Sequence, residues 1–230
     1  MPGYINRKKQ DAIWWFPVIV MHACRMPDSF FIGVAFKTGN TASVQDELIM
    51  QSTGGKLIHS EFMLGRPFDV RCYTACSMLQ QGSVQIKYES GFTPSRRFKS
   101  LPSRDEGWEC ICFPLQGHAR DYKLVYSVLL QLMALQLPYN YHDLWQCCSK
   151  AMLPFERDID YTNFNEWKAN GVFCSQVCLL LLRRFDSQGL ITLPPASRNY
   201  AYALNSRGCS PNTLFRILAC QQPLPDAKKK

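Results

Sequence analysis

The order of strand-like and helix-like segments is what most constrains the fold of this chain. Between residues 30 and 113, apolar and polar residues alternate in short runs, a pattern typical of β-strands. Turn signals such as Lys37-Thr38-Gly39-Asn40 and Gln81-Gly82 separate these runs. Helical spacing first becomes clear at 120–136, and Ser210-Pro211 signals the start of a last helix. Strands followed by helices predict an α+β fold with an antiparallel sheet. Strands are expected at residues 30–36, 56–64, 70–77, 84–89 and 108–113, and helices at 120–136, at 174–185 and after 210.

Length and composition favour one domain with extensions at both ends. The chain has 230 residues, of which 47% are hydrophobic, and this is enough for one sizeable core. We expect an N-terminal extension at residues 1–28, one domain at 29–220 and a basic tail at 221–230. Residues 91–107 are rich in Ser, Pro, Arg and Gly, and they predict a loop.

Charge and cysteine usage limit the classes of partner. The net charge of +8 is partly carried by short basic runs at 7–9 and 228–230, which are typical of solvated tails. Nucleic acid or an anionic surface is only weakly suggested, because no helix-turn-helix, zinc-finger or RNA-binding motif accompanies the charge. The 11 cysteines include no CxxC pair, so we expect no metal and no cofactor. Reduced thiols in a cytoplasmic setting follow from the absence of a regular disulfide framework.

An apolar run at residues 13–21 follows the first basic cluster. It is too short to span a bilayer and contains Pro17, so we predict no transmembrane helix. A signal peptide is the less favoured interpretation. The preferred one is a segment that packs on the domain or on a protein partner of the N-terminal extension.

Two residues carry the candidate chemistry. His59 lies in the predicted strand at 56–64, and Cys174 opens the apolar run of the predicted helix at 174–185. A thiol at a helix N-terminus is more acidic than usual, and a facing imidazole can act as base and acid. Gly171 permits a tight turn before the helix. Glu61 shares the strand face of His59 and could orient its ring, so we expect the His59/Glu61 face to meet the Cys174 helix and the apolar face to pack on the core.

Each of these residues also has an ordinary structural interpretation. A buried cysteine is more often a small core residue than a nucleophile, and ten other cysteines share the chain. A lone strand histidine is more often structural, and Glu61 reads equally well as an exposed carboxylate. Cys178, one helical turn after Cys174, is expected to face the core and to be inert.

The order of several motifs resembles the circularly permuted branch of the NlpC-like papain-fold superfamily of cysteine peptidases and amidases. That branch includes bacterial amidase-like proteins, poxvirus relatives and the lecithin retinol acyltransferase group. The histidine strand is similar to the family pattern of histidine, any residue, glutamate, and Phe173-Cys174-Ser175-Gln176 is similar to its nucleophile motif. The segments 73–77, 81–84, 138–144 and 210–214 also fit in order. The resemblance covers about residues 30–220 and implies a papain-like fold in which histidine precedes cysteine.

Two departures from the family pattern leave the third site residue open. The family often has glutamate after its Cys-Ser pair, whereas this chain has Gln176. In many relatives the third polar residue lies on the strand after histidine, so Ser77 or Thr74 competes with Glu61 for that role.

The resemblance implies a cysteine hydrolase that cleaves an amide, peptide or isopeptide bond of a protein or peptide substrate. The catalytic residues would be Cys174, His59 and Glu61. One alternative is a lipid acyltransferase or thioesterase of the same fold. Another is a catalytically idle structural protein of a virion. The poxvirus relatives point to a large DNA virus as the source, and therefore to a cytoplasmic or virion-associated protein.

Overall fold

The computed structural model describes residues 30–39, 44–65, 72–78, 83–89, 108–117, 119–148 and 157–219; for 72–78 and 83–89 it describes the backbone. The proposed N-terminal extension with its apolar run, the loop at 91–107 and the basic tail lie outside these residues. Among the described helices, none combines the length and the apolar character needed to cross a lipid bilayer.

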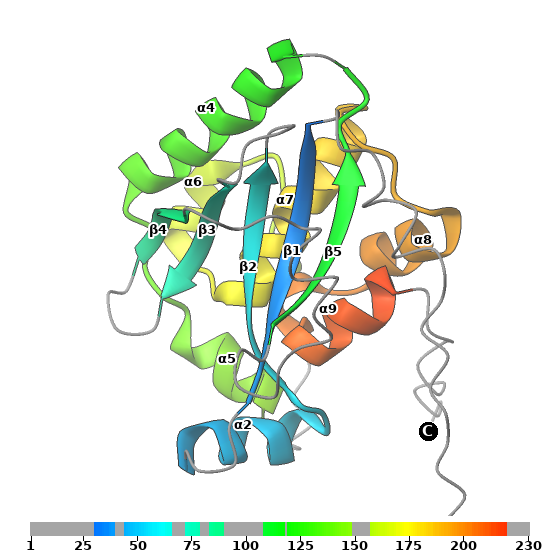
Figure 1. Ribbon diagram of the computed structural model, residues 1–230. Helices are drawn as coiled ribbons and strands as arrows, with labels where there is room; N and C mark the ends of the chain where they lie inside the picture. The colour runs from blue at the N-terminus through cyan, green and yellow to red at the C-terminus, as the bar shows by residue number, and fades with distance from the viewer. Residues whose placement is uncertain are drawn as a thin grey trace, which may run out of the picture.

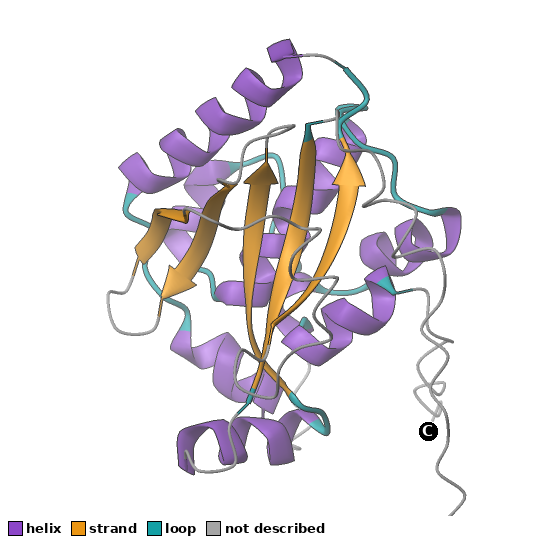
Figure 2. Ribbon diagram, viewed as in Figure 1, coloured by secondary structure: helices purple, strands orange, loops and turns teal. Residues whose placement is uncertain are grey.

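A five-stranded sheet organises the described part of the chain, with strand order β4-β3-β2-β1-β5 (Figures 1 and 2). All neighbouring strands pair antiparallel. The predicted α+β class with an antiparallel sheet is therefore confirmed, and each strand forms within a few residues of its predicted position. The strands are β1 (Phe31–Thr38), β2 (Leu57–Gly65), β3 (Cys72–Met78), β4 (Ser83–Glu89) and β5 (Trp108–Pro114).

Helix α7 packs along the sheet and forms the centre of the core. It contacts β2 and β3, lies behind the sheet in Figure 1, and is buried along nearly its whole length. The ring of Phe62 on β2 lies 5.7 Å from that of Phe185 on α7, and the ring of Phe36 on β1 lies 5.2 Å from that of Phe215 on α9. The sheet face that carries Phe36 and Phe62 therefore packs on α7 and α9. The helices are α2 (Val44–Thr53), α4 (Ala119–Leu135), α5 (Tyr141–Cys148), α6 (Phe164–Asn170), α7 (Cys174–Ser187), α8 (Pro195–Ala203) and α9 (Pro211–Leu218), with a 3-10 turn η1 (Ser206–Gly208).

The helix signals that depend on local chemistry are confirmed. Helix α4 covers the predicted 120–136, and α7 begins at Cys174 as expected. The hydroxyl of Ser210 accepts a hydrogen bond from the N–H of Thr213 at 3.1 Å, and Pro211 is the first residue of α9. Helices α2, α5, α6 and α8 were not predicted, and they cover the ends of the sheet and of α7 (Figure 1).

Candidate active site around Cys174 and His59

The turn before α7 places Cys174 at the first position of the helix. Gly171 has φ 70° and ψ 168°, a conformation open essentially to glycine alone, so the predicted tight turn is confirmed. A Cβ atom on Gly171 would lie 2.8 Å from the carbonyl oxygen of Pro138. The first hydrogen bond within α7 runs from the N–H of Val177 to the carbonyl of Phe173, at 3.0 Å. The N–H groups of Cys174 to Gln176 thus lie at the positive end of the helix dipole.

The first turn of α7 is fixed by the two residues after Cys174. The side-chain oxygen of Gln176 accepts a hydrogen bond from the N–H of Phe173 at 3.3 Å. This is the capping contact that a glutamate at the same position would make, so the departure from the family motif preserves the contact without adding a negative charge beside the thiol. The hydroxyl of Ser175 donates to the carbonyl of Cys209 at 2.5 Å.

The structure brings His59 and Cys174 into side-chain contact. Burial raises the pKa of the Cys174 thiol, but the charge of His59 and its hydrogen bond to the sulfur lower it. Further hydrogen bonds from the N–H groups of Ser60 and Ser175 act in the same direction, and the net result is a pKa below the ordinary value. The predicted proximity of the two residues is therefore confirmed.

Glu61 is the predicted third residue that lies beside the imidazole. Its carboxylate oxygen Oε1 is 3.5 Å from Nε2 of His59. Glu61 is buried, with a side-chain exposure of 8%, whereas the His59 side chain is 25% exposed. The pair is therefore open to solvent on the histidine side.

The competing residues on β3 are placed only by their backbone. Thr74 pairs with Met63 in the register of β2 and β3. Met63 is four positions beyond His59, a separation of about 13 Å along a strand. Ser77 lies in β3, beyond the part that pairs with β2. The described contacts therefore favour Glu61 over Thr74 as the neighbour of His59.

One expectation about the strand faces needs correction. Phe62 packs on Phe185 of α7, and strand alternation puts His59 and Glu61 on the opposite face from Phe62. The apolar face packs on the core as predicted, but that core is the Cys174 helix itself. His59 still contacts Cys174, and the N–H of Ser60, a main-chain group of the same strand, also donates to the sulfur. The sulfur is therefore at the edge of β2, where side chains from both faces can meet it.

The backbone pairing explains why this edge is accessible. Strand β3 pairs with β2 from Phe62 to Gly65, so the described ladder between these two strands stops short of His59. The register of β1 and β2 shifts between Lys37 and Thr38, which leaves Ile58 as an extra residue in β2. The N-terminal end of β2 is thus paired with β1 but lies outside the described ladder with β3, and the N–H group of Ser60 in this stretch binds the thiol.

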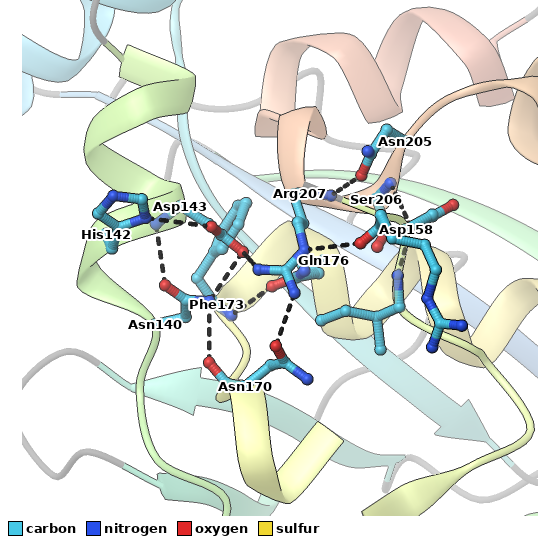
Figure 3. Close-up of polar contacts among 12 residues, drawn as sticks. Asn140, His142, Asp143, Asp158, Asn170, Phe173, Gln176, Asn205, Ser206 and Arg207 are labelled. Carbon is cyan, nitrogen blue, oxygen red and sulfur yellow. Dashed lines mark hydrogen bonds and ion pairs between the residues drawn. The ribbon is translucent and has the colours of Figure 1, made fainter. Parts of the chain in front are cut away.

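A buried polar network that the sequence did not reveal supports the turn before Cys174 (Figure 3). Arg207 donates to the carboxylate of Asp143 at 3.0 Å and to the side-chain oxygen of Asn170 at 2.6 Å. The amide of Asn140 donates to Asp143 at 2.8 Å and to the carbonyl of Asn170 at 3.0 Å. The N–H of Val172 donates to the carbonyl of Pro138 at 3.0 Å. The segment at 138–144, part of the family resemblance, therefore lies beside the residues that lead into α7.

The other thiols near the site differ from Cys174. Cys178 is fully buried in the apolar core, as predicted. Burial raises the pKa of the Cys209 thiol well above its ordinary value, and the nearby Cys147 adds to this effect. Cys174 is thus the cysteine among these whose surroundings favour the thiolate.

Compared with protein-family models, curated proteins and solved structures, this chain matches none of them.

Proposed function

We propose that this protein is a cysteine hydrolase that cleaves an amide, peptide or isopeptide bond, with Cys174 as nucleophile, His59 as base and acid, and Glu61 as the residue that orients the imidazole. The observation that carries this proposal is the contact between His59 and a helix-start thiol whose pKa is lowered. A thiolate held beside a protonated imidazole at a helix N-terminus is an activated nucleophile.

The fold supports a papain-like assignment in its permuted form. A papain-like site needs a nucleophile at the start of a buried helix and a histidine on an adjoining antiparallel sheet. Helix α7 and strand β2 supply these two elements, with the histidine earlier in the chain. The proposed permutation rests on this order together with the motif resemblance.

The proposed reaction has two halves. In the first, the thiolate of Cys174 attacks the substrate carbonyl carbon, and N–H groups at the start of α7 hold the developing oxyanion. Protonated His59 gives its proton to the leaving amine, the C–N bond breaks, and a thioester remains on Cys174. In the second, His59 takes a proton from water, the hydroxide attacks the thioester, and the C–S bond breaks to release the acid and restore the thiolate.

Acyl transfer or thioester hydrolysis on lipids is a second candidate that uses the same residues. It is favoured by large apolar side chains that face solvent on α2 and α5, two helices that contact each other near the N-terminal end of β2 (Figure 1). They include Leu48 on α2 and Trp145 on α5, and Trp145 is 72% exposed.

Labelling with iodoacetamide at neutral pH, read by peptide mass spectrometry, tests the nucleophile. In the wild type we expect Cys174 to be modified much faster than Cys178 or Cys209. The variant Cys174→Ala should lose the fast reaction, and Cys178→Ala should keep it. If Cys174→Ala reacts as fast as the wild type, the nucleophile assignment is wrong.

A substrate panel of peptide, isopeptide, ester and thioester compounds tests the reaction class. We expect Cys174→Ala to abolish turnover and His59→Ala to reduce kcat by a factor on the order of 10² to 10⁴. Glu61→Gln should cost less, because it keeps the shape of the residue that orients the ring. Fast labelling of Cys174 without turnover of any compound would instead support the idle structural protein.

A further inference from the structure

The N-terminal end of β2 pairs with β1, and the side chain of one residue of α9 also binds it. The side-chain oxygen of Asn212 accepts from the N–H of Leu57 at 3.1 Å, and its amide donates to the carbonyl of Leu57 at 2.9 Å. The same amide nitrogen donates to the hydroxyl of Thr53 at 2.8 Å. Asn212 therefore acts on β2 as a neighbouring strand would, with one donor and one acceptor on the same residue.

Close packing shows that this contact is built into the fold. Asn212 is buried, and Gly55 lies so near it that an added Cβ atom would be 2.1 Å from the side-chain oxygen of Asn212. The first turn of α9, which carries Asn212, is fixed by the Ser210 cap. The side chain of Asn212 is thus held in place by its packing against Gly55 and by the cap that fixes the first turn of its helix.

The same short segment also contacts the helix that carries the nucleophile. Ser175, directly after Cys174, donates its hydroxyl hydrogen bond to the carbonyl of Cys209. Residues 209–212, called here the 209–212 bridge, therefore contact α7 beside Cys174 at one end and β2 near His59 at the other. The two halves of the candidate dyad are connected through this bridge as well as through their direct contact.

We propose that Asn212 and Ser175 are positioning residues, and that the 209–212 bridge sets the geometry of His59 against Cys174. This inference rests on the Cys174–His59 pair of the proposed function. It does not require that the protein turns over a substrate. Leu57 lies two residues before His59, outside the described ladder of β2 with β3, so the amide of Asn212 acts together with β1 to fix where the strand end lies. Release of that end would move the imidazole away from the sulfur.

The pH dependence of Cys174 labelling tests this proposal in the full-length protein. The variant Asn212→Ala loses both bonds to Leu57, and Asn212→Asp keeps the side-chain volume but puts an acceptor opposite the carbonyl of Leu57. When the imidazole is displaced, His59 lowers the pKa of the Cys174 thiol less strongly. We expect the labelling midpoint to rise by about one pH unit, which slows labelling below the midpoint about tenfold. Ser175→Ala should shift the midpoint in the same direction.

The matched control is Asn163→Ala. Asn163 caps α6 through hydrogen bonds to the N–H groups of Asn165 and Glu166, and its loss costs about 1 kcal/mol without touching β2. Its labelling midpoint should equal that of the wild type, although its urea midpoint falls. If Asn212→Ala does not fold, Asn212→Asp and Ser175→Ala carry the test.

A wild-type labelling midpoint in either folded Asn212 variant would overturn the bridge as a positioning device, and so would an equal shift in Asn163→Ala. Because labelling needs no substrate, this result is separate from the proposed hydrolysis. A protein that turns over no compound can still show the shift, and an active hydrolase can fail to show it.

Discussion

At the scale of single residues, Cys174 and Cys209 show how position decides the chemistry of a thiol. Both are buried, and burial alone raises a thiol pKa because it disfavours the charged form. Cys174 also has a cationic partner and backbone N–H groups directed at its sulfur, and these outweigh burial. For Cys209, the effect of burial is the largest one, and the pKa of its thiol is raised. The imidazole of His59 is thus the main reason that the pKa of the Cys174 thiol is lowered whereas that of the Cys209 thiol is raised.

The lowered pKa of Cys174 predicts its reactivity against pH. The iodoacetamide labelling rate should reach half its plateau below about pH 8.5, the ordinary midpoint for a cysteine, because the thiolate persists to lower pH. In His59→Ala the burial effect remains while the lowering effect of His59 is lost, so the midpoint should move to higher pH. Rates measured from about pH 5 to about pH 10 check this. Equal midpoints in the two proteins would show that His59 does not act on the thiol.

At the scale of elements, the start of α7 depends on a backbone conformation that few residues adopt. Gly171 and Gly189 both have positive φ, of 70° and 68°. They differ in surroundings, because a Cβ atom on Gly171 meets the carbonyl of Pro138 whereas one on Gly189 meets nothing within 4 Å. Gly171 therefore combines a steric contact that Gly189 lacks with a ψ of 168° that glycine alone adopts readily.

Replacement of each glycine by alanine should destabilise the protein to a different extent. Gly189→Ala should lower the free energy of unfolding by about 1–2 kcal/mol, the cost of a left-handed residue with a Cβ atom. Gly171→Ala should cost about 1–3 kcal/mol more, because it adds a clash with the carbonyl of Pro138 and a backbone conformation that only glycine adopts readily. Urea denaturation measures both values. Gly171→Ala should also slow the labelling of Cys174, whereas Gly189→Ala should not, and equal losses of stability would contradict the role assigned to Pro138.

At the scale of the whole molecule, Arg207 joins segments that are far apart in the sequence. Its guanidinium contacts Asp143 on α5, Asn170 at the end of α6 and the carbonyl of Arg157. Arg207 and Asp143 are both buried, with side-chain exposures of 8% and 3%. Removal of the arginine would leave the carboxylate buried without its cation, and this is more costly than loss of a surface pair.

We therefore expect Arg207→Ala to lower the free energy of unfolding by about 3–5 kcal/mol, measured by urea denaturation. The control is Arg157→Ala, which removes an ion pair with Glu166 whose arginine is 84% exposed. The control should cost less than about 1 kcal/mol, and it leaves in place the backbone carbonyl that Arg207 uses. Similar losses in the two variants would mean that the buried pair contributes no more than a surface pair.

The sequence by itself determined the features that depend on near neighbours. Strand-like runs predicted the five strands, helical spacing predicted α4, an apolar run predicted α7, and the Ser210-Pro211 pair predicted the start of α9. It also identified His59 and Cys174, because a thiol at a helix start and an imidazole on a strand are visible locally. Helices α2 and α5 were missed because each is short, and tertiary packing stabilises such helices more than local propensity does.

Only the tertiary structure decided which distant groups meet. Strand periodicity put His59 on one face of β2, but its contact with Cys174 lies at the N-terminal end of that strand, which contains the bulge and is outside the described ladder to β3. The bonds of Asn212 to Leu57 and of Arg207 to Asp143 connect residues that no local pattern relates. Such contacts depend on how helices dock on the sheet. The way the helices dock depends on the packing of the whole core, so no short stretch of sequence determines it.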